Sequence, residues 1–211
     1  QFMYSMLTRS QRISHENLRL RDAKWLGGFE RWFAQSAGLQ LPEHVLAPPP
    51  MFTPFTVRGL TLKNRVVVSP MAQYSCVDGV PGDHHLVHLG ARALGGAALV
   101  MAEMSCPSAD ARITPGCPGL WNDTQRDAWQ RIVDHVHASS DAKVGIQLGH
   151  AGPKGSTNAP WEHNGADHAL PAHNWPLLAP SALPYLADGQ VPRGMSRADM
   201  DRVRDDFVHS T

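Results

Sequence analysis

The chain has 211 residues and a formal net charge of zero, from 19 basic and 19 acidic side chains. A balanced charge gives no strong basic field, so we expect neither nucleic acid nor an anionic membrane as a partner. The apolar fraction of 42% is ordinary for a globular protein, and no apolar run approaches the roughly 18 residues that a membrane span needs. Three cysteines without a secretory leader favour a cytoplasmic protein.

Both ends of the chain lack the features of natural termini. Residue 1 is Gln rather than Met, and residues 207–211 continue a helical pattern without a capping glycine. We therefore expect the chain to be a piece of a longer polypeptide.

Residues 1–41 combine arginines, leucines and aromatic side chains. Trp25, Phe29, Trp32 and Phe33 recur at helical spacing and can share one face, which is typical of a helix packed against a large neighbour. The next segment, 42–50, holds four prolines and favours an extended, semi-rigid connector, so we place a domain boundary there.

From residue 51 onward, expected strands and helices alternate, which predicts an α/β fold. A small hairpin about Arg58-Gly59 precedes the first strand. That strand runs from Val66 to Ser69. Its run of valines between a charged residue and a proline predicts burial on both faces.

Two more strands and three helices follow the first strand. The expected elements are a helix from His85 to Leu94 that stops at Gly95-Gly96, a strand from Ala98 to Ala102, a helix from Thr124 to Ala138, a strand from Val144 to Leu148, and a last helix from about Arg197, capped by Ser196 and Asp199. The loop from 149 to about 195 is far longer than a usual connection, which is typical of a functional segment.

Three strand–helix units fit a (β/α)8 barrel and a doubly wound sheet equally well by periodicity. No Gly-x-Gly-x-x-Gly follows the first strand, which counts against a dinucleotide-binding sheet. Polar clusters follow the expected strands: Ser69–Tyr74, Glu103–Cys106 and Gln147–Gly152, with a fourth cluster, Arg112–Asp123, in the second loop. Polar groups gathered from several strand ends are what a barrel active site needs.

Several sequence blocks, taken in order, resemble the Old Yellow Enzyme family of FMN oxidoreductases, and its bacterial, xenobiotic-reductase-like branch most. The blocks are Phe52–Phe55, Leu62–Arg65, Ser69–Met71, Gly119–Asp123, Gln147–Gly152 and Ser156–Glu162. The similarity covers residues 51–211. It implies the N-terminal part of a (β/α)8 TIM barrel, about three strand–helix units, that binds FMN.

A second resemblance concerns the basic stretch from Arg9 to Asp22, which is similar to the end of a flavoprotein monooxygenase domain. A monooxygenase joined to such a barrel is the arrangement of anthraniloyl-CoA and salicylyl-CoA monooxygenase/reductase proteins. The resemblance implies FAD in a missing upstream domain and makes a CoA thioester a candidate substrate.

The first resemblance implies a hydride relay from NAD(P)H through FMN to an unsaturated small molecule. It also implies roles for individual residues. Ser69, Pro70, Met71 and Ala72 would line the isoalloxazine ring, Met104 would lie near its rim, and Gln147 would hydrogen-bond its pyrimidine edge. Tyr74 would be the catalytic residue, because its phenol can donate a hydrogen bond to a substrate carbonyl where charge develops.

Three departures from the family pattern bear on these roles. Many relatives carry Cys or Thr where this chain has Ala72, so we expect an atypical flavin potential. Pro153 stands where the family usually has Arg, with only Lys154 nearby. The family's substrate-binding histidine pair follows the fourth strand and lies beyond this chain.

Simpler explanations stay open for the same residues. Ser69–Tyr74 also fits a proline-terminated core strand, and Gln147 and His150 could serve only to satisfy backbone groups. His84 and His88 have helical spacing but no carboxylate or thiolate partner at ligand spacing, so we expect no metal site. Cys76, Cys106 and Cys117 fit small loop residues better than nucleophiles.

The function has two alternatives. One is a stand-alone ene-reductase of xenobiotics; the other is a non-catalytic barrel that serves as a scaffold for the monooxygenase domain. The choice between NADH and NADPH, and between a monomer and a homo-oligomer, stays open at this point.

A first prediction concerns the isolated 211 residues. Three of about eight barrel units leave a strand edge and several helix faces uncovered, so the isolated chain should aggregate or stay partly unfolded. Thermal denaturation followed by circular dichroism checks this, and a sharp two-state transition of a soluble monomer would contradict it.

Overall fold

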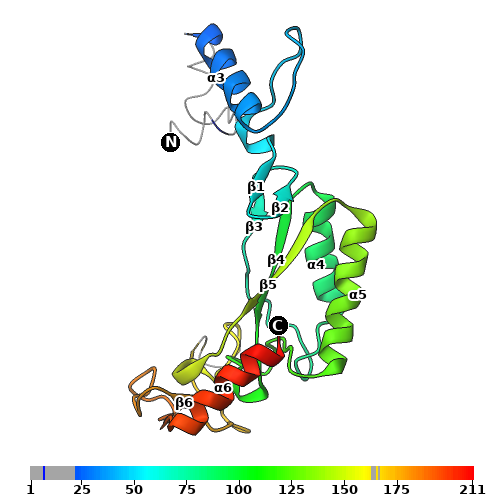
Figure 1. Ribbon diagram of the computed structural model, residues 1–211. Coiled ribbons are helices and arrows are strands. Elements are labelled where there is room, and N and C mark those ends of the chain that lie inside the picture. Colours follow the sequence, from blue (N-terminus) through cyan, green and yellow to red (C-terminus); the bar gives the residue numbers. More distant parts are fainter. Residues whose placement is uncertain (1–6, 8–21, 163–164, 166) are drawn as a thin grey trace. The chain divides into compact units, whose positions relative to one another are not determined.

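The computed structural model describes residues 7, 22–162, 165 and 167–211 (Figure 1). The stretch Arg9–Asp22, which resembles a monooxygenase end, lies outside the described residues except for Asp22. The chain divides into two compact units. One comprises residues 1–68, 92–100 and 139–143, and the other comprises residues 69–91, 101–138 and 144–211.

The first described helix is α3, Ala23–Ser36. It begins where the Asp22 carboxylate accepts a hydrogen bond from the backbone N–H of Trp25 at 2.8 Å. The aromatic side chains cluster as expected, with the rings of Trp25 and Phe29 stacked at 5.8 Å. The buried residues, however, are Leu26, Glu30 and Ala34, and Trp25 is 47% exposed. The aromatic stripe is therefore not the buried stripe of this helix.

The proline-rich segment is tied to α3 by one side chain. The Arg31 guanidinium donates hydrogen bonds to the carbonyl oxygens of Leu41, Pro42, Glu43 and Val45. Four carbonyl acceptors on one cation hold residues 41–45 in a defined turn. A short 3₁₀ helix, η1 (Pro50–Phe52), then leads toward the barrel segment.

Arg65 makes a second connection within this unit. Its guanidinium lies over the rings of Phe33 and Phe55 at 4.8 and 4.7 Å and donates to the Thr53 hydroxyl and the Pro54 carbonyl. Such stacking suits a guanidinium because it is planar and weakly hydrated. Arg65 thereby holds α3 and the start of the hairpin together.

The predicted hairpin is confirmed. Strands β1 (Phe55–Val57) and β2 (Leu60–Leu62) pair antiparallel, with Phe55 opposite Leu62. Arg58 adopts a left-handed φ of 53° in the two-residue turn, as hairpin turns of this length require.

The main sheet has three strands in the order β3-β4-β5: β3 (Val67–Val68), β4 (Leu99–Ser105) and β5 (Lys143–Leu148). β3 and β4 are parallel. The expected first strand is shorter than predicted, and its burial on both faces was wrong, since Val67 is 46% exposed. The physical reason is that β3 is an edge strand of the described sheet and has a strand neighbour on one side only.

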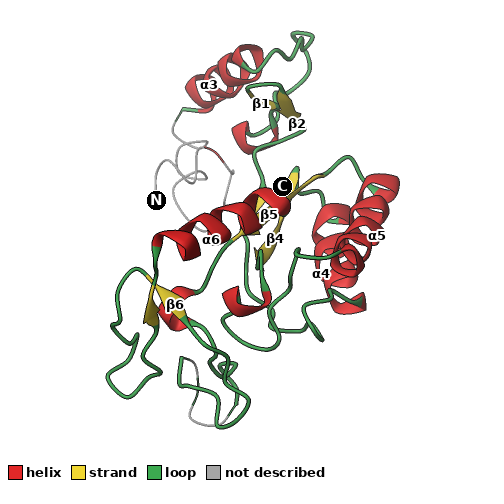
Figure 2. Ribbon diagram, turned by 60° about the horizontal axis from the view of Figure 1, so that its bottom comes forward, coloured by secondary structure: helices red, strands yellow, loops and turns green. Residues whose placement is uncertain are grey.

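Helices α4 (Asp83–Leu94) and α5 (Asp123–Ser139) confirm the predicted pair. They lie side by side along one side of β4 and β5 (Figures 1 and 2), where the rings of His85 and Trp129 meet edge to face at 5.9 Å. The buried residues of α5 recur at helical spacing and are Gln125, Trp129, Ile132 and Val136.

Strand β4 corrects the prediction of its end. We expected the strand to end at Ala102, but it continues to Ser105, so Glu103 and Met104 belong to the strand and not to a loop after it. Burial alternates along β4 until Ala102 and Glu103, two successive residues that are both buried. This change of phase points Glu103 into the protein and leaves Met104 half-buried.

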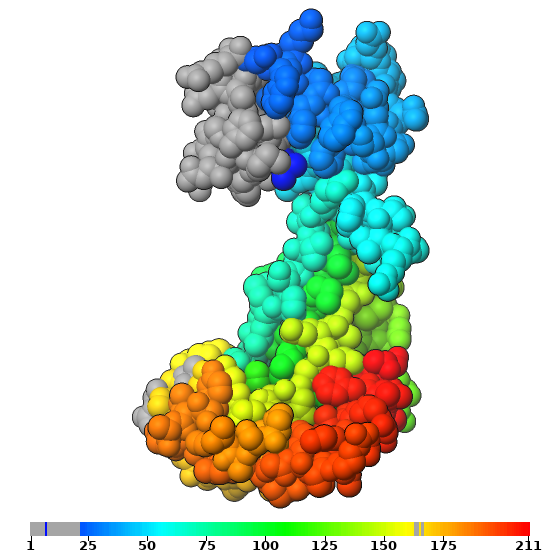
Figure 3. All heavy atoms as spheres, turned by 60° about the vertical axis from the view of Figure 1, so that its left-hand side comes forward, coloured from blue at the N-terminus to red at the C-terminus, as the bar shows by residue number. Residues whose placement is uncertain are grey.

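The long segment after β5 contains little regular structure. It carries the 3₁₀ helix η3 (Gly152–Lys154) and a parallel pair of short strands, β6 (Leu178–Ala179) and β7 (Arg193–Gly194). In Figure 3 the later part of this segment, in orange, lies directly against the last helix, in red. Helix α6 (Arg197–His209) starts at the predicted cap, a full capping box between Ser196 and Asp199. No helix in the described part of the chain is both long and apolar enough to cross a membrane.

Arg31 generates the second prediction. Replacing Arg31 with Met removes all hydrogen bonds from its guanidinium to residues 41–45. Because a hydrogen bond from a charged donor contributes about 1.5–3 kcal/mol, these residues should become mobile in the variant. We expect cleavage by chymotrypsin at Leu46, which is 87% exposed, to accelerate about tenfold or more in the intact protein. Lys24→Met on the same helix is the control, and equal cleavage of both variants would contradict the role of Arg31.

Candidate active site

The carboxyl ends of three neighbouring strands bring most of the predicted flavin residues to one place. Ser69 follows β3, Met104 lies on β4 and Gln147 lies on β5. The backbone N–H of Gly149 donates to the Ser105 carbonyl at 3.1 Å, which holds the ends of β4 and β5 beside each other. Residues that stand at the ends of successive strands in the sequence are therefore brought to the same edge of the sheet.

The chemistry of these side chains fits a flat ring with one polar edge. Met71 is 47% exposed and Met104 is half-buried, which provides thioether surface, while the Ser69 hydroxyl and the Gln147 amide are exposed and have no hydrogen-bond partner among the described residues. A Cβ atom at Gly149 would lie 2.6 Å from the Met104 Cγ, so only glycine permits this packing. An isoalloxazine ring needs this combination of apolar face and amide edge.

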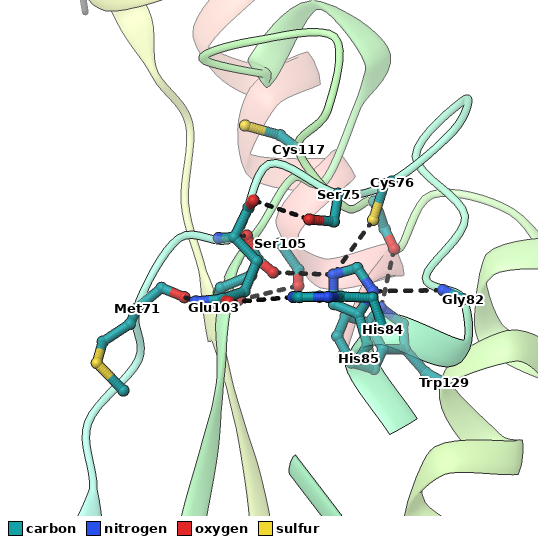
Figure 4. Close-up of polar contacts among 12 residues, drawn as sticks. Met71, Ser75, Cys76, Gly82, His84, His85, Glu103, Ser105, Cys117 and Trp129 are labelled. Atoms are coloured by element: carbon teal, nitrogen blue, oxygen red, sulfur yellow. Dashed lines mark hydrogen bonds and ion pairs between the residues drawn. The ribbon is translucent and has the colours of Figure 1, made fainter. Parts of the chain in front are cut away.

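Hydrogen bonds hold the segment that follows β3. The backbone N–H of Gln73 donates to the Glu103 Oε2 atom at 2.7 Å, and the Gln73 side chain donates to the Met71 carbonyl at 2.8 Å (Figure 4). The Gln73 Oε1 atom lies 3.2 Å from the His84 Nε2 atom. This segment therefore has a fixed path alongside β4.

Glu103 and His85 form a buried pair beneath that segment. They are 4% and 2% exposed, and the His85 Nε2 atom lies 2.9 Å from the Glu103 Oε1 atom (Figure 4). The His85 Nδ1 atom accepts from the backbone N–H of Gly82 at 3.3 Å, so the ring proton is on Nε2 and points at the carboxylate. The Cys76 Sγ atom lies 3.6 Å from the same Nε2 atom.

Tyr74 has an unusual backbone conformation. Its φ of 49° lies in the left-handed region, which a residue with a Cβ atom adopts at a cost, and such strain is typical of functional sites. Its carbonyl oxygen packs so closely on Gly116 that a Cβ there would overlap it, and Cys76 N donates to the Gly116 carbonyl at 3.0 Å. Burial raises the pKa of the Tyr74 phenol, which is a hydrogen-bond donor at neutral pH even without that shift.

A cavity of about 360 Å³ adjoins Tyr74. The ring of Trp161 lies 6.1 Å from that of Tyr74, and Arg112 and Glu162 add charged groups to the cavity wall. The wall thus combines aromatic surface with both signs of charge. Neither Met71 nor Met104 lines this cavity.

Cys76, Cys106 and Cys117 are free and buried. A hydrogen bond from the Cys106 thiol lowers the pKa of Cys117 to about 7, with further help from the backbone N–H of Thr114. Cys106 and Cys117 pack with Ala111 against Tyr74 and Met104. This cluster therefore supports the loop that contains Tyr74, which we call the tyrosine loop.

The His150 Nδ1 atom accepts from the backbone N–H of Gly152 at 3.0 Å, while its buried Nε2 atom has no hydrogen-bond partner among the described residues. The ammonium group of Lys154, which follows Pro153, is paired with Asp167 at 2.8 Å. Within the described ranges, no group of three histidine, cysteine or acidic side chains is placed to hold a metal ion.

A protein-family model described as the NADH:flavin oxidoreductase / NADH oxidase family matches residues 50–211. This chain belongs to that family. The resemblance to the Old Yellow Enzyme family is thereby confirmed.

Curated relatives and solved structures agree with the family. The chain is 40% identical over 161 residues to an NADH:flavin oxidoreductase of Gibberella zeae, covering 75% of this chain and 39% of that protein. It is 38% identical over 149 residues to an NADPH dehydrogenase of Bacillus cytotoxicus, covering 70% and 38%. The structure of morphinone reductase matches with a TM-score of 0.61 at 27% identity, covering 76% of this chain and 43% of that one. The chain therefore spans about two fifths of the length of these relatives, and its α/β fold is the corresponding part of their barrel.

The Glu103–His85 pair is the part of the site that sequence reasoning missed. The sequence pattern places Glu103 in a polar cluster after the second strand. It indicates His84 and His88 only as a pair at helical spacing that lacks the further ligands of a metal site. The available signal was an acidic residue directly continuing the apolar run from Ala98 to Ala102, since a buried carboxylate needs a donor.

Gly116 generates the third prediction. In Gly116→Ala the new Cβ must displace the Tyr74 carbonyl, so we expect the free energy of unfolding to fall by about 1–3 kcal/mol. Gly59→Ala is the matched control, because nothing lies within 4 Å of a Cβ at Gly59. Chemical denaturation of the intact protein measures both variants, and an equal effect would mean that the tyrosine loop is not tightly packed.

Proposed function

We propose that this chain is the FMN-binding part of an NAD(P)H-dependent oxidoreductase that reduces an electron-poor double bond of a small molecule. When bound, FMN supplies the chemistry that accepts hydride from the nicotinamide and donates it to the substrate. The observation that carries the proposal is the surface of Met71 and Met104 flanked by the unpaired polar groups of Ser69 and Gln147. Family membership supports it, and the relatives named NADPH dehydrogenase favour NADPH.

On this proposal, the residues after β3 hold one side of the ring. Ser69, Pro70, Met71 and Ala72 line it, Met104 lies at its rim, and the Gln147 amide hydrogen-bonds its polar edge. Ala72 contributes no polar side-chain atom, so the groups that tune the potential differ here from those of relatives with Cys or Thr.

Tyr74 has the catalytic role in this proposal. A phenol is protonated at neutral pH, and burial raises the pKa of this one further, so it is able to donate to a substrate oxygen on which negative charge develops. The adjoining cavity of about 360 Å³ receives the part of the substrate away from the reacting carbon. Its mixed wall of aromatic and charged groups suits a polar aromatic molecule better than a plain hydrocarbon.

The upstream half of the proposal concerns residues before the family match. Only residues 50–211 match the family, and α3 lies outside that match with its aromatic stripe partly exposed. We assign residues 1–41 to the end of a monooxygenase-like domain, joined through segment 42–50, with an aryl-CoA thioester as the substrate class. The test is the flavin content of the full-length protein, where one FAD and one FMN per chain are expected and FMN alone would overturn this assignment.

Tyr74 generates the fourth prediction. Tyr74→Phe keeps the ring but removes the donor, so re-oxidation of the NADPH-reduced full-length protein by an α,β-unsaturated ketone should slow about 10²-fold. Reduction by NADPH should change less than threefold, since the phenol is assigned to the substrate. Stopped-flow absorbance of the flavin measures both steps. Tyr185→Phe is the control, because Tyr185 is a half-exposed tyrosine outside this set of residues.

The scaffold alternative makes the opposite prediction. A non-catalytic barrel would purify without FMN, or would bind it without oxidation by any unsaturated ketone. Either result in the wild-type protein overturns the proposed function, whatever the Tyr74→Phe variant does.

A further inference from the structure

We propose that the buried Glu103–His85 pair is a positioning device for Tyr74, which determines how fast the substrate is reduced. The inference rests on the proposed function for its kinetic consequence. The pair lies outside the thioether surface that would hold the flavin, and neither side chain lines the cavity beside Tyr74. Its influence must therefore pass through the backbone.

The backbone path is short. Glu103 accepts from the N–H of Gln73, and that amide belongs to the residue directly before Tyr74. On the other side, the N–H of Cys76 donates to the Gly116 carbonyl, and Gly116 packs against the Tyr74 carbonyl. The backbone is therefore held on both sides of Tyr74, an arrangement that we call the clamp. The Glu103 carboxylate holds the N–H of Gln73, and the Gly116 carbonyl holds the N–H of Cys76.

The clamp is needed because the conformation of Tyr74 is unfavourable on its own. At a φ of 49°, the Tyr74 Cβ crowds the backbone, and a free chain returns to negative φ. Releasing Gln73 removes the restraint on one side of that residue. The phenol would then sample several positions, and the fraction of time in which it meets the substrate oxygen would fall.

His85 gives the carboxylate its direction. The Nε2–H donates to Oε1 at 2.9 Å, which leaves Oε2 for Gln73, and the Nδ1 atom is held by Gly82. The ring also packs on Trp129 of α5. The contacts thus run from Trp129 of α5 through His85 to Glu103 (Figure 4), and from Glu103 to Gln73, the residue before Tyr74.

A matched pair of variants separates the hydrogen bond from the bulk of the side chain. Glu103→Gln keeps one oxygen that can accept from Gln73 and loses the oxygen that accepts from His85, whereas Glu103→Met has similar length and no oxygen acceptor. The first readout is hydrogen exchange at the Gln73 amide in the intact protein, measured by mass spectrometry. We expect exchange to be at least tenfold faster in Glu103→Met than in the wild type, and less than threefold faster in Glu103→Gln.

The second readout is a double-mutant cycle with Tyr74→Phe, followed in the FMN-loaded protein. Glu103→Met should slow re-oxidation by the unsaturated ketone at least tenfold and leave reduction by NADPH within threefold of the wild type. In the Tyr74→Phe background the same substitution should slow re-oxidation less than twofold, because there is no phenol left to position. If Glu103→Met does not fold, His85→Phe replaces it, since the ring keeps its packing on Trp129 and loses the donor.

The results that overturn the inference differ from those that overturn the proposed function. Unchanged Gln73 exchange, or slowing of both flavin steps to the same extent, would mean that the pair is only structural. Additive effects in the cycle would mean that Glu103 does not act through Tyr74. A wild-type protein that shows no reduction of unsaturated ketones defeats the proposed function, and the exchange measurement still tests the clamp.

Discussion

The organisation of this site depends on one buried carboxylate. Glu103 is 4% exposed on β4, and burying a charge of this kind costs several kcal/mol unless donors compensate. The donors come from two directions, His85 of α4 and the backbone of Gln73 after β3. Satisfying one charge therefore fixes a helix, a strand and the segment after β3 with respect to one another. The change of burial phase at Ala102 and Glu103 makes this possible, because it places the carboxylate inside while Met104 stays half-buried.

The elements with local signals could be predicted from the sequence. The Ser196–Asp199 capping box and the stop of α4 at Gly95-Gly96 depend on side chains within a few residues of each other, so the sequence displays them directly. The exposure of Val67 and the extension of β4 to Ser105 depend on neighbours elsewhere in the chain. A run of valines has the same pattern in a central strand and in an edge strand, which is why its burial was predicted wrongly.

The candidate site divides in the same way. The meeting of Ser69, Met104 and Gln147 follows from parallel strands, whose carboxyl ends share one edge, so the sequence order of the clusters was enough to expect it. The conformation of Tyr74 was not predictable, because the glycine that accommodates its carbonyl is Gly116, in a loop more than forty positions later. The resemblance indicated which residues matter, and the structure adds what holds them.

Ala72 and Tyr74 lie two positions apart in a segment that is anchored through Gln73 between them. On the proposed function, the alanine removes a polar side chain from the flavin surface, whereas the anchor keeps the tyrosine in its strained conformation. The two neighbours would therefore affect different properties: Ala72 the tuning of the flavin, and Tyr74 the orientation of the substrate. On the same proposal, Gln147, Ser69 and the backbone would tune the flavin, and Tyr74 held by Glu103 would orient the substrate. A change in flavin potential here thus leaves the geometry of the tyrosine untouched, because the anchoring contacts of Gln73 and Cys76 involve no atom of Ala72.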